Sequence, residues 1–150
     1  MPKERHSVEV QKARRPDAKA IAELSGQLGY PATETEMAER LVALLRRGRE
    51  NLVLVARDAD RKVIGWIHSS VTPLLEVPLR AEVNGLIVAD GHRSGGAGAA
   101  LLRAAEHWAK LKGCKSMSVR SNVIRDRAHA FYLRTGYEHY KTQKAFRKEL

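Results

Sequence analysis

Residues 86–98 read Leu-Ile-Val-Ala-Asp-Gly-His-Arg-Ser-Gly-Gly-Ala-Gly, and a helical pattern of apolar residues continues from there to Leu111. The apolar start of the stretch, Leu86 to Val88, is typical of a buried strand. A glycine-rich turn that enters a helix brings free backbone N–H groups and the positive end of the helix dipole to one place. The run Arg93 to Gly98 therefore predicts either a phosphate-binding turn or a plain tight turn.

The segments around this stretch predict one mixed sheet with helices on its faces. Strand 80–89, helix 97–111 and strand 115–120 form a βαβ unit, so the two strands run parallel. The other expected elements are, in order, a strand at 7–14, a helix capped by Pro16 and Asp17, a helix with the capping-box pair Thr33 and Glu36, a hairpin of 52–57 and 62–71, a helix at 125–135 and two short strands within 137–148. The order β-α-α-β-β-β-α-β-α-β-β predicts the α/β (α+β) class, with a mostly antiparallel sheet of about six to seven strands and about four helices.

Length and composition favour one ordinary globular domain spanning 1–150. The chain has 150 residues, of which 43% are hydrophobic and 29% charged. No apolar run approaches the roughly 20 residues that a membrane-spanning helix needs. Residues 1–15 mix charged and apolar types and contain no apolar core of the signal-peptide kind. We therefore expect no membrane partner and a cytoplasmic location.

Charge and the metal-ligand residue types point away from two other classes of function. The net charge is +10, but the 27 Lys and Arg residues are spread over both halves of the chain. A basic surface that partly serves an anionic cofactor explains this better than a nucleic-acid site does. The histidines show no ligand spacing, and Cys114 is the sole cysteine. No metal site is expected, and Cys114 and the two tryptophans, Trp66 and Trp108, are expected to pack in the core.

The glycine run and the residues after it resemble the GCN5-related N-acetyltransferase (GNAT) superfamily. Its signature is Gln or Arg, two residues, Gly, one residue, then Gly or Ala at the start of a helix, and Arg93, Gly96 and Gly98 match it. Further matches follow in the family's order at Asn122, Ala128, Phe131, Tyr132, Gly136 and Tyr137. The upstream order of a strand, two helices and a hairpin is similar as well. The resemblance thus covers nearly the whole chain and implies the GNAT fold.

The resemblance implies that acetyl-CoA is the acetyl donor. In that family the pyrophosphate lies on the backbone amides of the glycine loop, here Arg93, Ser94, Gly95, Gly96, Ala97 and Gly98. The pantetheine arm lies along a strand, here Leu86, Ile87 and Val88, and Asn122 resembles the residue that hydrogen-bonds this arm. The glycines agree with this, because phosphate oxygens can approach a backbone that lacks Cβ atoms. Gly95 departs from the basic residue that is frequent there, so binding depends more on the amides and on Arg93.

The resemblance also implies an acid and a base for direct transfer to an amine. Tyr132 resembles the general acid that protonates the leaving thiolate, and a core tyrosine is the alternative. Glu82 lies where the histone-acetylating branch has its glutamate base. Strand alternation places Glu82 and Asn84 on one face with Leu86 and Val88, so either side chain or an intervening water can take the proton.

The acceptor remains open at this level. In this family acceptor choice depends on the two-helix segment and the hairpin loops, here 26–39 and 72–78. Their glutamates suit a cationic amine such as an aminoglycoside, a polyamine or a peptide lysine, or are simply solvated: Glu34, Glu36, Glu39 and Glu76. A competing hypothesis is a non-catalytic acyl-CoA-binding or nucleic-acid-binding module. By analogy with the family, a homodimer is expected.

Overall fold

The computed structural model describes residues 7–93, 95–121 and 123–150. These residues form two compact units, Met1–Arg120 and Ser121–Leu150, which are described in turn. The first unit contains, in order, β1 (Glu9–Lys12), a 3₁₀ turn η1 (Arg15–Asp17), α1 (Ala18–Gln27), α2 (Glu34–Arg46), β2 (Asn51–Arg57), β3 (Val63–Val71), β4 (Arg80–Val88), α3 (Ala97–Leu111) and β5 (Ser116–Val119). The second unit contains α4 (Asp126–Arg134). This is the predicted order up to the end of α4.

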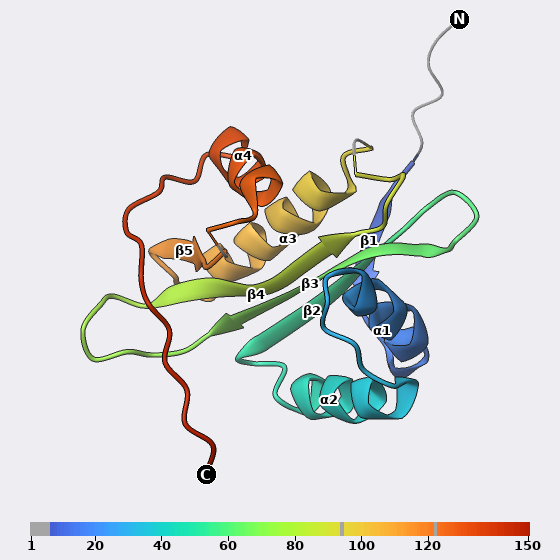
Figure 1. The fold of residues 1–150 in the computed structure, drawn as a ribbon, viewed down its shortest axis with the longest axis horizontal. Coiled ribbons are helices and arrows are strands. Elements are labelled where there is room, and N and C mark those ends of the chain that lie inside the picture. Colours follow the sequence, from blue (N-terminus) through green and yellow to red (C-terminus); the bar gives the residue numbers. More distant parts are fainter. Residues whose placement is uncertain (1–6, 94, 122) are drawn as a thin grey trace, which may run out of the picture. The chain divides into compact units, whose positions relative to one another are not determined.

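The strands of the first unit form one mixed sheet in the order β1-β2-β3-β4-β5 (Figure 1). The first three pairings are antiparallel, and β4 and β5 run parallel, as the βαβ pattern predicts. The predicted fold class is therefore confirmed. The described residues contain five strands, however, which is fewer than the expected six to seven.

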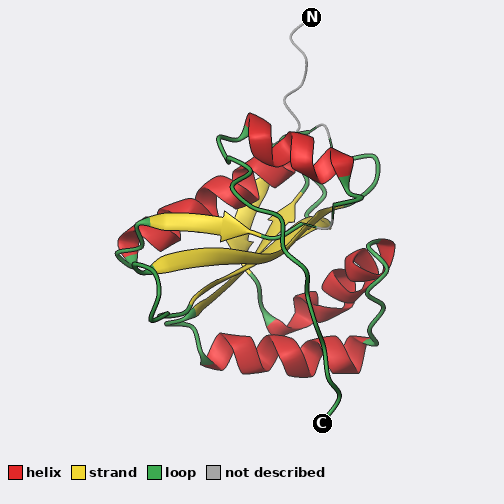
Figure 2. Cartoon of the chain, turned by 60° about the vertical axis from the view of Figure 1, so that its left-hand side comes forward, coloured by secondary structure: helices red, strands yellow, loops and turns green. Residues whose placement is uncertain are grey.

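Helices cover both faces of this sheet. Figures 1 and 2 show α1 and α2 on one side and α3 on the other. The side chains of α3 that face the sheet recur at helical spacing and are buried: Ala97, Leu101, Leu102, Ala105 and Ala109. On the opposite face, Ile21 and Leu24 of α1 and Leu41 of α2 share a core cluster with Val53 and Val55 of β2. Helices on both sides explain why residues 52–56 of β2 and 63–67 of β3 are all apolar or glycine.

The two helix starts of the N-terminal half differ in how they form. Thr33 and Glu36 form the predicted capping box at the start of α2, with reciprocal hydrogen bonds of 3.1 and 3.2 Å. Asp17 is the N-cap residue of α1, as predicted, but its side chain makes no capping hydrogen bond to that helix. Its carboxylate instead accepts the Arg14 N–H and pairs with Arg57, because a buried carboxylate needs a full set of partners.

The second unit consists of α4 and an extended C-terminal segment. On α4 the ring of Tyr132 contacts the rings of Phe131 and Tyr137 edge-on, at centroid distances of 5.2 and 5.7 Å. Gly136 ends the helical segment with a positive φ of 97°, which glycine adopts without strain.

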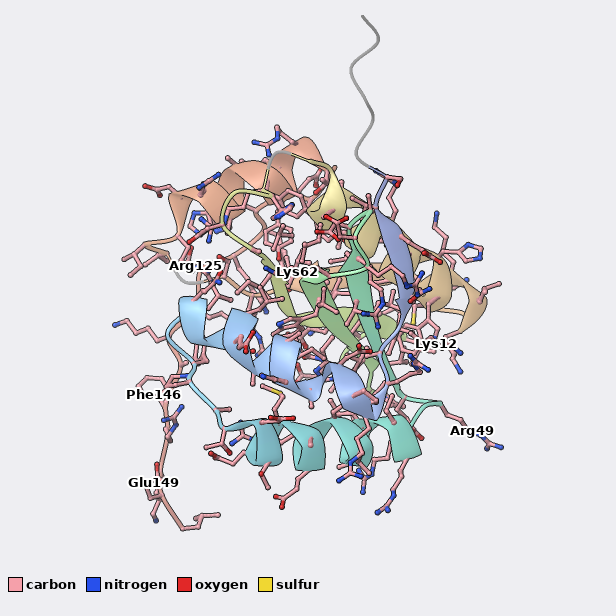
Figure 3. All side chains as sticks on the ribbon, turned by 90° about the vertical axis from the view of Figure 1, so that its right-hand side faces the viewer. Lys12, Arg49, Lys62, Arg125, Phe146 and Glu149 are labelled. Atoms are coloured by element: carbon pink, nitrogen blue, oxygen red, sulfur yellow. The ribbon has the colours of Figure 1, made fainter. Side chains whose placement is uncertain are left out.

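The two short strands predicted within 137–148 are absent. All residues from 137 to 150 are described, none is in a strand, and those from Glu138 onward are exposed, including the labelled Phe146 and Glu149 of Figure 3. An isolated two-stranded hairpin is marginal in water, and Thr142 provides no Asn-Gly or Asp-Gly turn to start one. The His139 ring instead contacts the Lys141 carbonyl and the Thr142 hydroxyl, at 3.1 and 3.0 Å.

Two further features bear on the expected partners. Within the described residues no helix is long and apolar enough to span a bilayer. Lys12, Arg49 and Lys62, labelled in Figure 3, are exposed on β1 and on the turns before β2 and before β3. The basic side chains of the first unit are thus spread over several separate elements.

Candidate active site

The glycine loop leads into α3 through a left-handed residue. Gly96 is the N-cap of α3 and has a φ of +85°, a conformation that favours glycine. The first N–H to bond back along the helix is that of Ala100, which donates to the Gly96 carbonyl at 3.0 Å. The preceding N–H groups of the first turn therefore have no acceptor within the helix. A helix start with free N–H groups can bind an anion, although the Gly95 N–H already donates to the His92 carbonyl at 3.1 Å, and Ser94 lies outside the described residues.

The Arg93 side chain joins the glycine loop to the end of β4. Its guanidinium pairs with Asp90 at 2.7 Å, and its Nε lies 3.5 Å from the Val88 carbonyl oxygen. Its side chain keeps 36% of its accessible surface. Arg93 therefore ties the end of β4 to the loop and still presents positive charge to solvent beside it.

The strand before the loop has a backbone edge that no described strand covers. β5 pairs with β4 only over Arg80 to Val83, so β4 continues past the end of β5. The register between β3 and β4 also shifts between His68 and Ser69, and the buried Ser69 hydroxyl donates to the Glu82 carbonyl at 2.8 Å beside that shift. Because of the shift, Glu82 shares a face with Gly85 and Ile87, so the expectation that it lies on one face with Leu86 and Val88 is wrong. Leu86, Ile87 and Val88 thus lie on a stretch of β4 whose second edge can take an added strand-like chain, and the pantetheine site stays a prediction for this edge.

Glu82 lies near the start of β4 and is paired with an arginine. Its Oε1 is 2.9 Å from Nε of Arg120, the residue that follows β5. The Arg120 side chain is 78% exposed and that of Glu82 26% exposed. Beside them, Asn84 donates from its amide to the Ser70 hydroxyl at 2.7 Å. The carboxylate is therefore held at the sheet surface by a cation that solvent reaches, and Asn84 is a hydrogen-bonded neighbour.

Sequence reasoning missed one polar pair on the same part of the sheet. The His68 Nε2 lies 2.9 Å from the Asn51 Oδ1, which joins β3 to the start of β2. Burial lowers the pKa of His68. The signal was the alternation of Trp66, His68 and Ser70, which places three side chains on one face of β3.

Trp66 lies in the same row of side chains on β3, but it packs against the core. It packs against the cluster of Val53, Val55 and Ile87, as the core prediction for tryptophan requires. Its ring lies so close to Gly85 that a Cβ there would be 2.7 Å from it. Because Gly85 has no Cβ, the indole ring can lie against the β4 backbone at this position. Trp108 and Cys114 also pack in a smaller cluster, where burial raises the pKa of the Cys114 thiol.

Tyr132, the predicted general acid, lies in the second unit. Burial raises the pKa of its phenol, and the positive charge of Arg125 opposes part of that increase. A phenol with a raised pKa stays protonated through the physiological range, as a proton donor must. Asn122, the predicted partner of the pantetheine arm, lies outside the described residues.

The first unit thus places most predicted residues on one continuous strand, loop and helix. Glu82, the strand Leu86 to Val88 and the described part of the run from Arg93 to Gly98 follow one another from β4 into α3. Together they offer a carboxylate, a free strand edge and a helix N-terminus. These are the features that a phosphate-bearing, elongated ligand with a reactive end requires.

Comparison with known proteins identifies this arrangement. Residues 18–137 match the model of the acetyltransferase (GNAT) family. The chain is 29% identical over 120 residues to an aminoglycoside N(6')-acetyltransferase type 1 from Klebsiella aerogenes, and 78% of each chain is covered.

Two solved structures show the same fold. Aminoglycoside 6'-N-acetyltransferase AAC(6')-Ih from Acinetobacter baumannii superposes with a TM-score of 0.84 at 18% identity, over 96% of this chain and 99% of that one. Aminoglycoside N-acetyltransferase AAC(6')-Iy, solved in complex with CoA, has a TM-score of 0.85 at 16% identity, over 100% and 99% of the two chains.

The chain therefore belongs to the acetyltransferase (GNAT) family, and the predicted resemblance is confirmed. Its class of activity is N-acetyl transfer, for which this family uses acetyl-CoA as the donor.

Proposed function

We propose that the protein transfers the acetyl group of acetyl-CoA to a primary amine of a cationic, hydroxyl-rich small molecule of the aminoglycoside type. The observation that carries this proposal is the ion pair of Glu82, at the sheet surface, with the exposed Arg120 guanidinium at 2.9 Å. A carboxylate that binds one solvent-accessible cation suits another of similar charge, such as an ammonium group. The similarity to an aminoglycoside N(6')-acetyltransferase supports the same class of acceptor.

The residues of the chain divide into donor binding and proton transfer. The first-turn amides of α3 and Arg93 bind the pyrophosphate, and the free edge of Leu86 to Val88 binds the pantetheine arm. Asn122 is assigned to the same arm through the family resemblance alone. Acetyl-CoA supplies a thioester whose carbonyl carbon is open to attack by an amine.

Two residues balance the protons of the transfer. The amine nitrogen forms the new C–N bond as the C–S bond breaks. Glu82, directly or through a water, takes the proton that the nitrogen loses. Tyr132, assigned through the family resemblance alone, donates a proton to the departing sulfur. The products are an acetamide and free CoA thiol. Cys114 takes no part, so the acetyl group passes directly to the amine.

The test measures the release of CoA thiol from acetyl-CoA across a panel of amines. The panel contains aminoglycosides, polyamines, amino acids and lysine peptides, and includes two aminoglycosides that differ only in an amino or a hydroxyl group at the 6' carbon. We expect turnover with the 6'-amino compound and little with its hydroxyl partner. Selective turnover of peptides or polyamines would contradict the proposed acceptor, and no turnover with any amine would favour the non-catalytic alternative.

A variant of the proton donor tests the mechanism within the same assay. Tyr132→Phe is expected to lower turnover while leaving the acetyl-CoA affinity, measured by calorimetry, nearly unchanged. An unchanged rate at saturating substrate would remove Tyr132 as the acid. The homodimer and the cytoplasmic location remain predictions, and light scattering of the purified protein tests the first of them.

A further inference from the structure

The face of the sheet that α1 and α2 cover changes from apolar to polar along its strands. Its apolar part contains Val53, Val55 and Ile87, which pack against the two helices. Toward the start of β2, two residues before Val53, the same face continues with Asn51. Its cross-strand partner is Ser70, which in turn pairs with Glu82. The polar end of this face therefore includes the proposed acceptor carboxylate.

His68 lies on that face between the apolar part and the Glu82 row. It is two residues from Ser70, about 7 Å along the strand. Its cross-strand partners are Val53 on β2 and Gly85 on β4. Because Gly85 has no side chain, β4 places only backbone directly opposite the imidazole, and the Trp66 ring lies over that backbone. The ring is partly buried and retains an exposed portion.

A chain of hydrogen bonds determines which nitrogen of His68 carries the proton. The Arg47 carbonyl accepts from both the backbone N–H and the side-chain Nδ2 of Asn51, at 3.0 and 3.3 Å. A carbonyl oxygen can only accept, so the side-chain atom that faces it is the amide NH₂ of Asn51. The Oδ1 of Asn51 then faces Nε2 of His68 and can only accept from it.

The same chain leaves the other ring nitrogen with a free lone pair. With the proton on Nε2, the Nδ1 of the neutral ring is an acceptor. Within the described part of the chain, Nδ1 has no hydrogen-bond partner. Burial lowers the pKa of His68 and so favours the neutral ring, which does not repel a cation bound at Glu82. The sheet surface thus presents a carboxylate and, about 7 Å away along β3, a neutral acceptor.

We propose that His68 is a specificity-determining residue of the acceptor site, where its Nδ1 accepts a hydrogen bond from a hydroxyl or ammonium group of the amine substrate. Asn51 is the positioning residue, because its amide sets the tautomer. The inference rests on the proposed function, since it places a second polar group of the same acceptor beside the amine held at Glu82. A hydrogen bond to Nδ1 of His68 selects hydroxyl-rich or multiply aminated acceptors over simple alkyl monoamines, which have no second polar group to reach Nδ1.

Two substitutions separate Nδ1 from the rest of the ring. An asparagine side chain places its amide oxygen near the position of Nδ1, whereas a glutamine reaches the position of Nε2. We expect His68→Gln to raise the KM for an aminoglycoside about 10- to 100-fold, the range for losing a hydrogen bond to a charged or strongly polar group, with kcat changed far less. His68→Asn should stay within about fivefold of wild type. The KM for a simple alkyl monoamine, which has no second polar group, should not change with either variant.

His107→Gln serves as the matched histidine control. His107 is exposed on α3, which covers the opposite face of the sheet, so its replacement should leave every KM unchanged. Circular dichroism shows whether each variant folds. Equal KM values for wild type and a folded His68→Gln variant would overturn the inference.

Nitrogen NMR of the imidazole tests the inference without turnover. In the free protein, the His68 signals should be those of a neutral ring with the proton on Nε2, and Asn51→Leu should remove that preference. Adding an aminoglycoside should shift the Nδ1 signal in wild type. A proton on Nδ1 in the free protein, or no shift when the acceptor binds, would overturn the inference even if the protein acetylates aminoglycosides. Failure of the thiol-release panel with a correct tautomer and a shifted Nδ1 would contradict the proposed function instead.

Discussion

Each end of the sheet has a carboxylate paired with an arginine, and the two pairs differ in burial and in their other hydrogen bonds. At one end Asp17 lies 2.6 Å from Arg57, with side-chain exposures of 7% and 12%. Asp17 also accepts the Arg14 N–H, and Arg57 also donates to Gln11. At the other end Glu82 pairs with an Arg120 that is 78% exposed. The first pair is enclosed and fully bonded, whereas the second is open to replacement by a ligand.

This difference separates a pair that supports the fold from one that is available for chemistry. A buried ion pair is costly to break because the remaining charge has no solvent around it. An open pair contributes little to stability, since water and salt screen it. We therefore expect the closed end to respond to substitution in unfolding experiments and the open end to respond in kinetics.

The largest expected effect is on stability at the closed end. Asp17→Ala leaves Arg57 buried without its carboxylate and is expected to lower the free energy of unfolding by about 3–5 kcal/mol. Urea denaturation followed by circular dichroism measures this. Asp60→Ala, at an exposed position in the β2–β3 turn, is the control. A loss below about 1 kcal/mol at Asp17 would show that the closed pair is no more important than a surface one.

The next effect is on catalysis at the open end. Glu82→Gln keeps the shape of the side chain and removes its charge, so kcat should fall about 100-fold or more while stability changes by less than about 1 kcal/mol. The loss should be greatest below the pH at which the acceptor amine deprotonates by itself. Steady-state thiol release across pH measures it. A small effect that is uniform across pH would reassign Glu82 to substrate positioning.

Double-mutant cycles compare the two pairs directly. The coupling free energy of Glu82 and Arg120 should lie between about 0 and 1 kcal/mol, because the arginine is exposed. The coupling of Asp17 and Arg57 should be several-fold larger. Both cycles use the same urea denaturation with single and double alanine variants. Equal couplings would remove the contrast between the ends.

The smallest effect is the pH dependence of stability that comes from His68. Its pKa in the folded protein is lowered by burial, so on acidification the unfolded chain takes up the proton first. Its contribution to stability is therefore complete above the unfolded pKa of about 6.5 and is lost as the pH falls through and below that value. In His68→Gln, the decline of the urea midpoint between neutral and mildly acidic pH should be shallower. An identical decline in both proteins would contradict the assigned environment.

The sequence predicted most of the fold, and its site residues remain predictions. Local rules apply to the capping box at Thr33, the hairpin of β2 and β3 and the glycine loop before α3, because each depends on residues close in the chain. The C-terminal strands were predicted wrongly because alternation alone does not supply the partner strand that a β-strand needs.

Other features depend on residues that are distant in sequence. The residues next to Asp17 in the sequence predict a helix cap, but its carboxylate pairs with Arg57, which is 40 residues away. The residues paired with Glu82 and His68, Arg120 and Asn51, carry no local signal for their roles. The register of β2 with β3 and that of β4 with β5 decide these contacts, and neither follows from local propensity.

The sequence by itself determined the class of protein, through the glycine loop and the order of elements around it. Those features act locally, since a helix N-terminus binds an anion wherever the chain turns in this way. The tertiary structure decided what surrounds the proposed acceptor site. It paired Glu82 with Arg120 and placed Asn51, whose amide donates to the Arg47 carbonyl, against the ring of His68. These pairs depend on the alignment of the strands, because the partners lie on separate elements that the sheet brings together.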